Sequence, residues 1–243
     1  MSEILREHFQ LKETAVTIFA RKKEHIDAAK RSIAGQRRFL EDFIEQDPFF
    51  MVTLEPYDLQ ANSAPPIVKR MIESSAMVGV GPMACVAGII AEIAVQAMID
   101  AGATYAIVDN GGDICILNDV PVTVGVYAGR SPLRDLAFEI PARTNPLGIC
   151  TSSGSVGPSI SFGCADAATV ISNDLALADA SATALGNAVQ ATAPLEQCFL
   201  AVDRPGVIGA LVIRGEKMAL WGDLPALVRA HVGEERITRA QTI

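Results

Sequence analysis

The sequence predicts an α+β fold in which a largely antiparallel sheet packs against a long buried helix and a second helix of small residues. Residues 84–103 are an apolar run rich in alanine and glycine, which is typical of a helix that other backbones approach closely. Residues 103–117 hold two apolar runs around Asn-Gly-Gly-Asp, and Asn-Gly supplies the positive φ angles of a tight hairpin. Helices and strands follow one another without a regular β-α-β repeat, which disfavours a doubly wound parallel sheet.

The other elements follow from local apolar patterns and turn residues. Strands are expected at 9–20, 121–128, 135–140, 148–153, 166–172, 197–203 and 207–215. Helices are expected at 24–46, 66–77 and 177–189, with a proline-punctuated loop over 47–66. We expect the whole chain, 1–243, to be a single domain. Its parts would be an N-terminal strand and helical cap (1–60), the core (61–222) and a polar tail (223–243).

The apolar segment 84–103 is almost long enough to span a bilayer. Three polar residues interrupt it, and Glu92, Gln96 and Asp100 follow one another at steps of four, so they form one polar edge. A carboxylate in the middle of a membrane span is costly. A buried helix of a protein core is therefore the favoured interpretation, and no membrane is expected as a partner.

Composition excludes several classes of protein. A net charge of -8 gives no positive field, so nucleic acid is not expected as the main partner. The N-terminus has charges where a signal peptide needs an apolar core, which predicts a cytoplasmic protein. Five cysteines without C-x-x-C spacing predict reduced, mostly buried thiols. Lys23, Lys30 and Arg37 repeat at sevens, either as a solvated helix face or as a face for an anionic partner.

The usual catalytic motifs are missing. Histidine occurs only at 8, 25 and 231, which leaves little material for a Ser-His-Asp centre or a histidine-ligated zinc site. Neither a P-loop motif nor a G-x-G-x-x-G turn after a strand is found. Cys150 and Cys164 flank a glycine-rich stretch and would be nucleophiles only if a charged partner lowered their pKa.

A polar stripe on the predicted helix 177–189 is the strongest candidate site. Asp179, Thr183 and Asn187 follow one another at steps of four, so they point the same way from a helix of small residues. Asp179 lies too deep in the helix to be its cap. Its carboxylate is therefore either exposed to water or part of a functional site. Carboxylate, hydroxyl and carbonyl oxygens together suit Mg²⁺ better than zinc.

A hydroxyl-rich loop precedes that helix. Residues 150–166 carry Thr151, Ser152, Ser153 and Ser155 together with Gly154, Gly157 and Gly163. Such a loop can hold phosphate through hydroxyls and backbone amides, or it can be a plain surface turn. Two glycines and Pro82 before the buried helix form a second turn whose free amides can face an anion.

Several stretches resemble one family. "GVGPMACVAGIIAE", "VDNGGDICI", "GICTSSGSVGPSISFGCADAATV" and "LADASATALGN" are similar to an uncharacterised ApbE-like family of bacterial and archaeal proteins. The resemblance covers about residues 66–190. "VDNGGDI", "TSSG" and "ATVISNDLALADASATAL" also occur in the order of three motifs of the longer ApbE-type FAD:protein FMN transferases.

The resemblance implies an ApbE-like (T-fold-like) architecture and a site. Asp179 and Thr183 match the Asp and Thr of an A-D-A-x-x-T motif that binds Mg²⁺ beside the flavin diphosphate. The resemblance also implies a nucleotide pocket lined by the NGGD turn and the TSSG loop, that is, by Asn110, Gly111, Gly112, Asp113, Thr151, Ser152, Ser153 and Gly154. FAD or another flavin nucleotide and Mg²⁺ are the implied cofactors.

The chain also departs from the transferases. Their A-K-G motif corresponds to Val86-Ala87-Gly88, which has no lysine, and their H-x-x-D-P stretch has no counterpart. Two functions stay open: a Mg²⁺-dependent transferase or hydrolase of flavin or nucleotide diphosphates, and a non-catalytic protein that binds a flavin or another phosphorylated ligand. The third hypothesis is that Asp179 has a purely structural role. The partner is a small phosphorylated molecule, and a homodimer is compatible with the small-residue helix.

Overall fold

The structure is a computed structural model, and it describes residues 3–58, 64–129, 131–133, 135–152, 163–231, 233 and 238. Its main sheet has, within those residues, eight strands in the order β1-β2-β3-β4-β7-β8-β9-β10, and every neighbouring pair is antiparallel. The strands are β1 Leu5–Leu11, β2 Thr14–Ala20, β3 Ala106–Asn110, β4 Asp113–Leu117, β7 Leu147–Ser152, β8 Ala167–Ser172, β9 Val207–Arg214 and β10 Lys217–Gly222.

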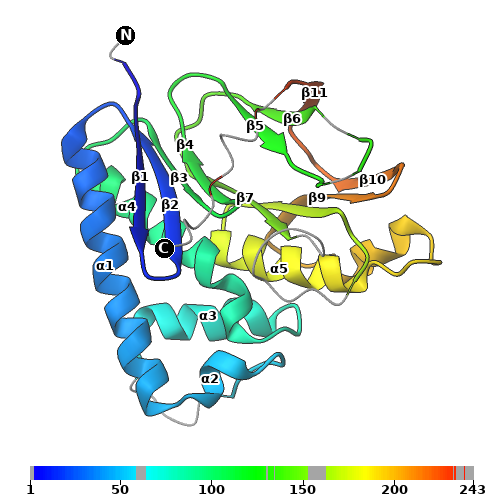
Figure 1. Cartoon of the computed structure of the whole chain (residues 1–243), viewed down its shortest axis with the longest axis horizontal. Helices are drawn as coiled ribbons and strands as arrows, with labels where there is room; N and C mark the ends of the chain where they lie inside the picture. Colours follow the sequence, from blue (N-terminus) through cyan, green and yellow to red (C-terminus); the bar gives the residue numbers. More distant parts are fainter. Residues whose placement is uncertain are drawn as a thin grey trace.

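A smaller sheet covers part of one face of the main sheet (Figure 1). Its described strands are β5 Val122–Val126, β6 Leu136–Ile140 and β11 Ala226–Arg229, and both of its pairings are antiparallel. Phe138 and Ile140 of this sheet are fully buried in one apolar cluster with Leu211 of the main sheet. The sequence predicted a polar tail from residue 223. The first part of that segment instead forms β11, so the prediction is wrong for residues 226–229.

Helices cover the opposite face of the main sheet, where the larger apolar cluster lies (Figure 1). They are α1 Lys23–Gln46, α2 Phe49–Val52, α3 Pro66–Ala76, the short η1 Pro82–Cys85, α4 Val86–Asp100, α5 Leu175–Ala188 and the short η2 Leu195–Ala201. α4 and α5 contact each other and also contact strands of the sheet. The predicted α+β fold with an antiparallel sheet, a buried helix and a small-residue helix is confirmed.

α4 is a core helix. With η1 it is long and apolar enough to cross a membrane, yet half of that window is buried inside the protein, and α4 contacts α1, α5, β3 and β4. Its polar edge has partners: Glu92 forms an ion pair with Arg70 and accepts the Leu175 amide N–H at 2.8 Å, and Gln96 donates to Asp100. Glu92 therefore joins α4 to α3 and α5, whereas Gln96 and Asp100 bond to each other within α4.

Three segments differ from the sequence prediction. The expected strand 9–20 is a hairpin of two strands, which turns at Lys12 with a φ of 51°. The expected loop 47–66 contains the single helical turn α2. The segment expected to be a strand at 197–203 lies mostly in η2, which starts after Pro194. The prediction failed because a short apolar run fits a strand or a helix equally well.

The basic residues of α1 face acidic partners within the chain. Lys23 and Lys30 both pair with Glu7, and Arg37 pairs with Glu13 and Glu41. Ion pairs within the chain thus account for the repeat at sevens, and the prediction of a solvated face holds best for Lys23, since the Lys30 and Arg37 side chains are only 23% and 12% exposed.

Candidate functional site

The polar stripe of α5 exists as the sequence predicts. Asp174 caps the helix, because its side chain accepts the Leu177 N–H at 3.0 Å. The small residues of α5 let it lie deep in the core, and Asp179 is only 9% exposed. Thr183 and Asn187, one and two turns further on, are partly exposed. The stripe therefore runs from a buried carboxylate toward solvent.

Asp179 closes the N-terminus of α4. Its Oδ2 accepts the Gly88 N–H at 2.7 Å, and the carboxylate also accepts from the Ala87 amide. Cys85, the residue in the cap position of α4, makes no side-chain cap. The first amides of a helix need an acceptor, so Asp179 supplies from α5 what an N-cap residue normally supplies locally.

The two helices cap each other. Glu92 of α4 accepts the first amide of α5, and Asp179 of α5 accepts amides in the first turn of α4. Gly88 allows this close crossing, because a Cβ built there would lie 2.6 Å from the Leu175 carbonyl oxygen and 2.7 Å from the Asp179 Cβ. We call this arrangement the reciprocal cap.

The NGGD turn lies against the same end of α4. Asn110 donates its side-chain amide to the Ala87 carbonyl at 3.0 Å. Gly111 and Gly112 have φ angles of 71° and 107°, which only glycine adopts readily, and Asp109 accepts the Gly112 N–H at 3.0 Å. The predicted hairpin is confirmed, and the contact of Asn110 with α4 fixes its tip.

A pair of carboxylates forms the electrostatic centre of this region. Burial raises the pKa of Asp179 well above its usual value, and the charge of Asp113 raises it further. Burial also raises the pKa of Asp113, to about 7, and Asp109 adds to the shift. Among the described residues, no lysine or arginine forms an ion pair with Asp113 or Asp179. The buried Asp179 and the half-buried Asp113 thus interact without a compensating cation in the described part of the chain.

This donor set fits a hard divalent cation. Buried charges are normally paired or coordinate a metal, and a cation would offset both carboxylates. The candidate ligands are Asp179, Asp113 and the Thr183 hydroxyl, one helical turn from Asp179. No group of three His, Cys, Asp or Glu side chains within the described ranges could hold a metal ion, which argues against a zinc-type site.

The TSSG loop starts beside the NGGD turn. Asp113 pairs in register with Cys150, and the Thr151 carbonyl oxygen lies 3.7 Å from the position of a Cβ on Gly112. The Thr151 hydroxyl bonds to the Thr169 hydroxyl at 2.9 Å, and Ser152 is buried. The Ser153 and Gly154 predictions lie outside the described residues. The structure thus brings the start of the loop to the predicted hairpin.

The cysteine hypothesis finds no support at Cys150. Burial raises the pKa of this thiol well above its usual value, and the charges of Asp113 and Asp179 raise it further. A thiol that stays protonated is a poor nucleophile. Cys164 is exposed, whereas the other four cysteines are buried and free, as predicted for reduced thiols.

Two partners of the site could not be found from sequence. Thr238 is buried; its hydroxyl donates to Asp109 at 2.5 Å and also forms a hydrogen bond with the Thr17 hydroxyl at 2.8 Å. It lies in the segment predicted to be a polar tail, and no local pattern signals that it returns to β3. Arg70, which joins α3 to Glu92 and Asp174, likewise has no signature in the sequence.

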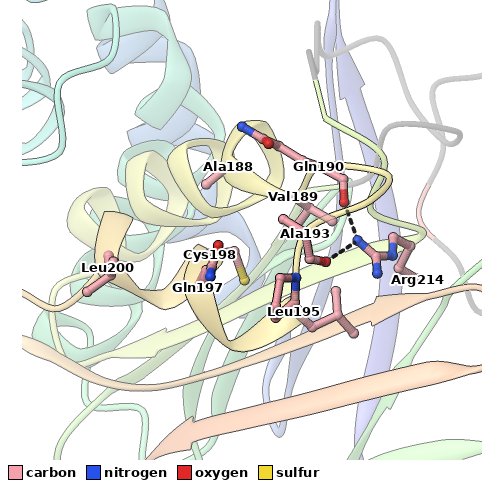
Figure 2. Close-up of a pocket in the computed structure, with 10 residues that line it drawn as sticks. Ala188, Val189, Gln190, Ala193, Leu195, Gln197, Cys198, Leu200 and Arg214 are labelled. Atoms are coloured by element: carbon pink, nitrogen blue, oxygen red, sulfur yellow. Dashed lines mark hydrogen bonds between the residues drawn. The ribbon is translucent and has the colours of Figure 1, made fainter.

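A cavity of about 210 Å³ lies at the other end of α5, where Ala188 and Val189 line it (Figure 2). Arg214 closes one side and donates to the carbonyl oxygens of Gln190 and Ala193. Ala188 is nine residues beyond Asp179, about 13 Å along a helix, so this cavity is separate from the carboxylate pair.

Asp113→Asn is expected to change how stability depends on pH. The pKa of Asp113 is higher in the folded chain, which therefore keeps a proton between about pH 4 and 7 that the unfolded chain has lost. Stability must then fall as pH rises through this window. The variant should be more stable than the parent at pH 8 by on the order of 2 kcal/mol, but not at pH 4.

Urea unfolding in EDTA at pH 4, 6 and 8 measures this difference. Asp203→Asn, at an exposed position, is the control. Its free energy of unfolding should match that of the parent at all three pH values. Parallel pH profiles for the parent and Asp113→Asn would contradict a buried, protonated Asp113.

Comparison with known proteins places this chain in a family. A family model described as AbpE bacteria matches residues 2–199. A UPF0280 protein of Methanothrix thermoacetophila is 58% identical over 236 residues, which cover 97% of this chain and 100% of the relative. A UPF0280 protein of Methanosarcina acetivorans is 52% identical over 238 residues, which cover 97% of this chain and 94% of the relative.

Solved structures share the fold at low identity. The apo flavinyl transferase ApbE of Pseudomonas stutzeri matches with a TM-score of 0.57 and 11% identity, covering 90% of this chain and 93% of that one. The ApbE protein of Thermotoga maritima matches with a TM-score of 0.52 and 14% identity, covering 98% and 100%. The fold is therefore ApbE-like, and the chain belongs to the AbpE bacteria family.

Proposed function

We propose that this chain is a metal-dependent enzyme that cleaves a flavin or related nucleotide diphosphate, as a transferase or a hydrolase. One observation supports this most directly: the buried carboxylate of Asp179 and the half-buried carboxylate of Asp113 interact electrostatically, and no described lysine or arginine forms an ion pair with either. Both belong to stretches that resemble the transferase motifs. The likeness to a protein named flavinyl transferase supports the same class of reaction.

In this proposal Asp179, Asp113 and Thr183 hold Mg²⁺. When bound, the ion would neutralise the charge of the diphosphate and polarise the phosphorus under attack. The residues of the chain bind and orient the ligand. The NGGD turn offers backbone amides beside the site, and the TSSG loop offers hydroxyls from the neighbouring strand end.

The reciprocal cap would keep the proposed site rigid. Asp179 is held by the α4 amides, so one of its oxygens has a fixed position before any ligand arrives. Such preorganisation is what electrostatic catalysis requires.

A second candidate is a protein that binds a flavin or another phosphorylated ligand without turnover. The observation that favours it is the start of α4, where Val86-Ala87-Gly88 offers no lysine and the first-turn amides already bond to Asp179. A phosphate would then find fewer positive groups than in the transferases. Both candidates use the same pocket and differ only in whether a bond is broken.

Turnover separates the two. Purified chain is incubated with FAD and MgCl₂, and FMN and AMP are quantified by chromatography. The enzyme hypothesis predicts AMP that is absent in EDTA and lost in Asp179→Asn, together with free FMN where water is the acceptor or FMN bound to the chain where one of its hydroxyls is the acceptor. The binding hypothesis predicts intact FAD together with thermal stabilisation, worth about 2.7 kcal/mol at a hundredfold excess over Kd. If FAD, FMN and AMP give neither product nor stabilisation, both candidates are wrong.

A further inference from the structure

The single helical turn α2 exposes a dense apolar surface. Phe49, Met51, Val52 and Leu54 have exposed fractions of 62%, 52%, 61% and 54%. We call these four side chains the α2 patch. Isolated exposed apolar residues are ordinary, but four large ones within six positions are a mark of an interaction surface.

The backbone beneath the α2 patch is fixed. Phe50 is fully buried and packs edge-on against the rings of Phe43 and Tyr57, at centroid distances of 5.1 and 5.3 Å. A Cβ on Gly81 would lie 2.1 Å from the Thr53 carbonyl oxygen, so the chain after α2 packs tightly on the turn before η1. The outward side chains are thus presented by an anchored element.

Acidic residues surround the α2 patch in the chain. Residues 39–68 contain no lysine or arginine and six carboxylates, Glu41, Asp42, Glu45, Asp47, Glu55 and Asp58. This segment therefore contributes -6 to a net charge of -8. Asp42, Glu45 and Glu55 are exposed on either side of α2. Glu41 pairs with Lys12 and Arg37, and Asp42 pairs with Arg38, whereas Glu45 and Glu55 form no ion pair with a described residue. We call Glu45 and Glu55 the acidic rim of the α2 patch.

We infer that the α2 patch docks a segment of another protein that is apolar at its centre and basic at its rim. Complementary charge favours such a partner over the two alternatives. A second copy of this chain would bring two acidic rims together, and like charges across an interface are costly. An anionic membrane surface would repel the same rim.

The position of α2 connects this surface with the candidate site, although the inference does not depend on the proposed function. α2 contacts η1, and η1 leads into α4 and contacts α5. A docked protein segment would therefore lie next to the elements that hold Asp179. The test below uses no flavin, so its outcome is separate from that of the turnover experiment.

The probe is a fluorescein-labelled, 14-residue amphipathic helix of leucine and lysine, with a matched leucine and glutamate peptide. Anisotropy is measured with the full chain at low and high salt. We expect the lysine peptide to bind with a salt-dependent affinity and the glutamate peptide not to bind. The double variant Met51→Ser/Val52→Ser should weaken binding at least fivefold, and Glu45→Gln/Glu55→Gln should reduce its salt dependence.

A matched variant controls for general apolar contact. Met218 and Leu220 of β10 are 38% and 50% exposed outside the acidic segment, and Met218→Ser/Leu220→Ser should bind like the parent. Circular dichroism checks that all variants fold. Equal binding of both peptides, or unchanged binding by Met51→Ser/Val52→Ser, overturns the proposal. Self-association of the parent that is lost in Met51→Ser/Val52→Ser would overturn the proposal in favour of a second copy. Sedimentation with phosphatidylglycerol vesicles that is lost in the same variant would overturn it in favour of a membrane.

Discussion

Asp179→Ala is expected to destabilise the fold by about 2–4 kcal/mol, whereas Asp179→Asn should stay within about 1 kcal/mol of the parent. Alanine leaves the Gly88 and Ala87 amides without an acceptor in a buried place, and each unsatisfied donor is costly. Asparagine keeps an acceptor oxygen and removes a charge that burial disfavours. The two variants thus separate the capping role of Asp179 from its charge.

The proposed metal site needs that charge. If the chain cleaves FAD, Asp179→Asn should fold normally and lose activity by at least about 100-fold. Urea unfolding and FMN release are measured on the same preparations. An active Asp179→Asn variant would show that the carboxylate is structural only, and a fully stable Asp179→Ala variant would contradict the capping role.

Gly88→Ala is expected to lower the free energy of unfolding by about 3 kcal/mol. The added Cβ would lie 2.6 Å from the Leu175 carbonyl oxygen, and backbone atoms of a buried helix cannot move away cheaply. α4 and α5 would have to separate, which would also lengthen the hydrogen bond from Gly88 to Asp179. Urea unfolding measures the loss.

Gly35→Ala is the matched control for this substitution. Gly35 lies within α1, and a Cβ there would meet nothing within 4 Å. Alanine favours a helix over glycine, so this variant should gain up to about 1 kcal/mol. Equal effects at the two positions would contradict the close crossing of α4 and α5.

Local patterns predicted most of the fold. The NGGD hairpin and the small-residue helix are encoded within a few residues each, so the sequence alone locates them. β10 and β11 depend on pairing with distant strands, and η2 looks like a strand because its apolar run is short. Such elements are decided by tertiary contacts, which a local pattern does not contain.

The candidate site was predicted in part for the same reason. The stripe of Asp179 and Thr183 is visible from spacing, and the family resemblance added the NGGD turn and the TSSG loop. What spacing could not show is that Asp179 bonds to the start of α4 and that Glu92 bonds to the start of α5. These bonds join residues more than 80 positions apart, so only the folded arrangement reveals them.

The reciprocal cap makes the two central helices energetically interdependent. Each helix takes an acceptor for its first turn from the other, although α5 also has its own cap at Asp174. The energetic effects of Glu92 and Asp179 substitutions are therefore coupled through one shared crossing and should not simply add. Since the partners are distant in sequence, this crossing forms only after a long stretch of chain has been brought together, which places it among the slower events of folding.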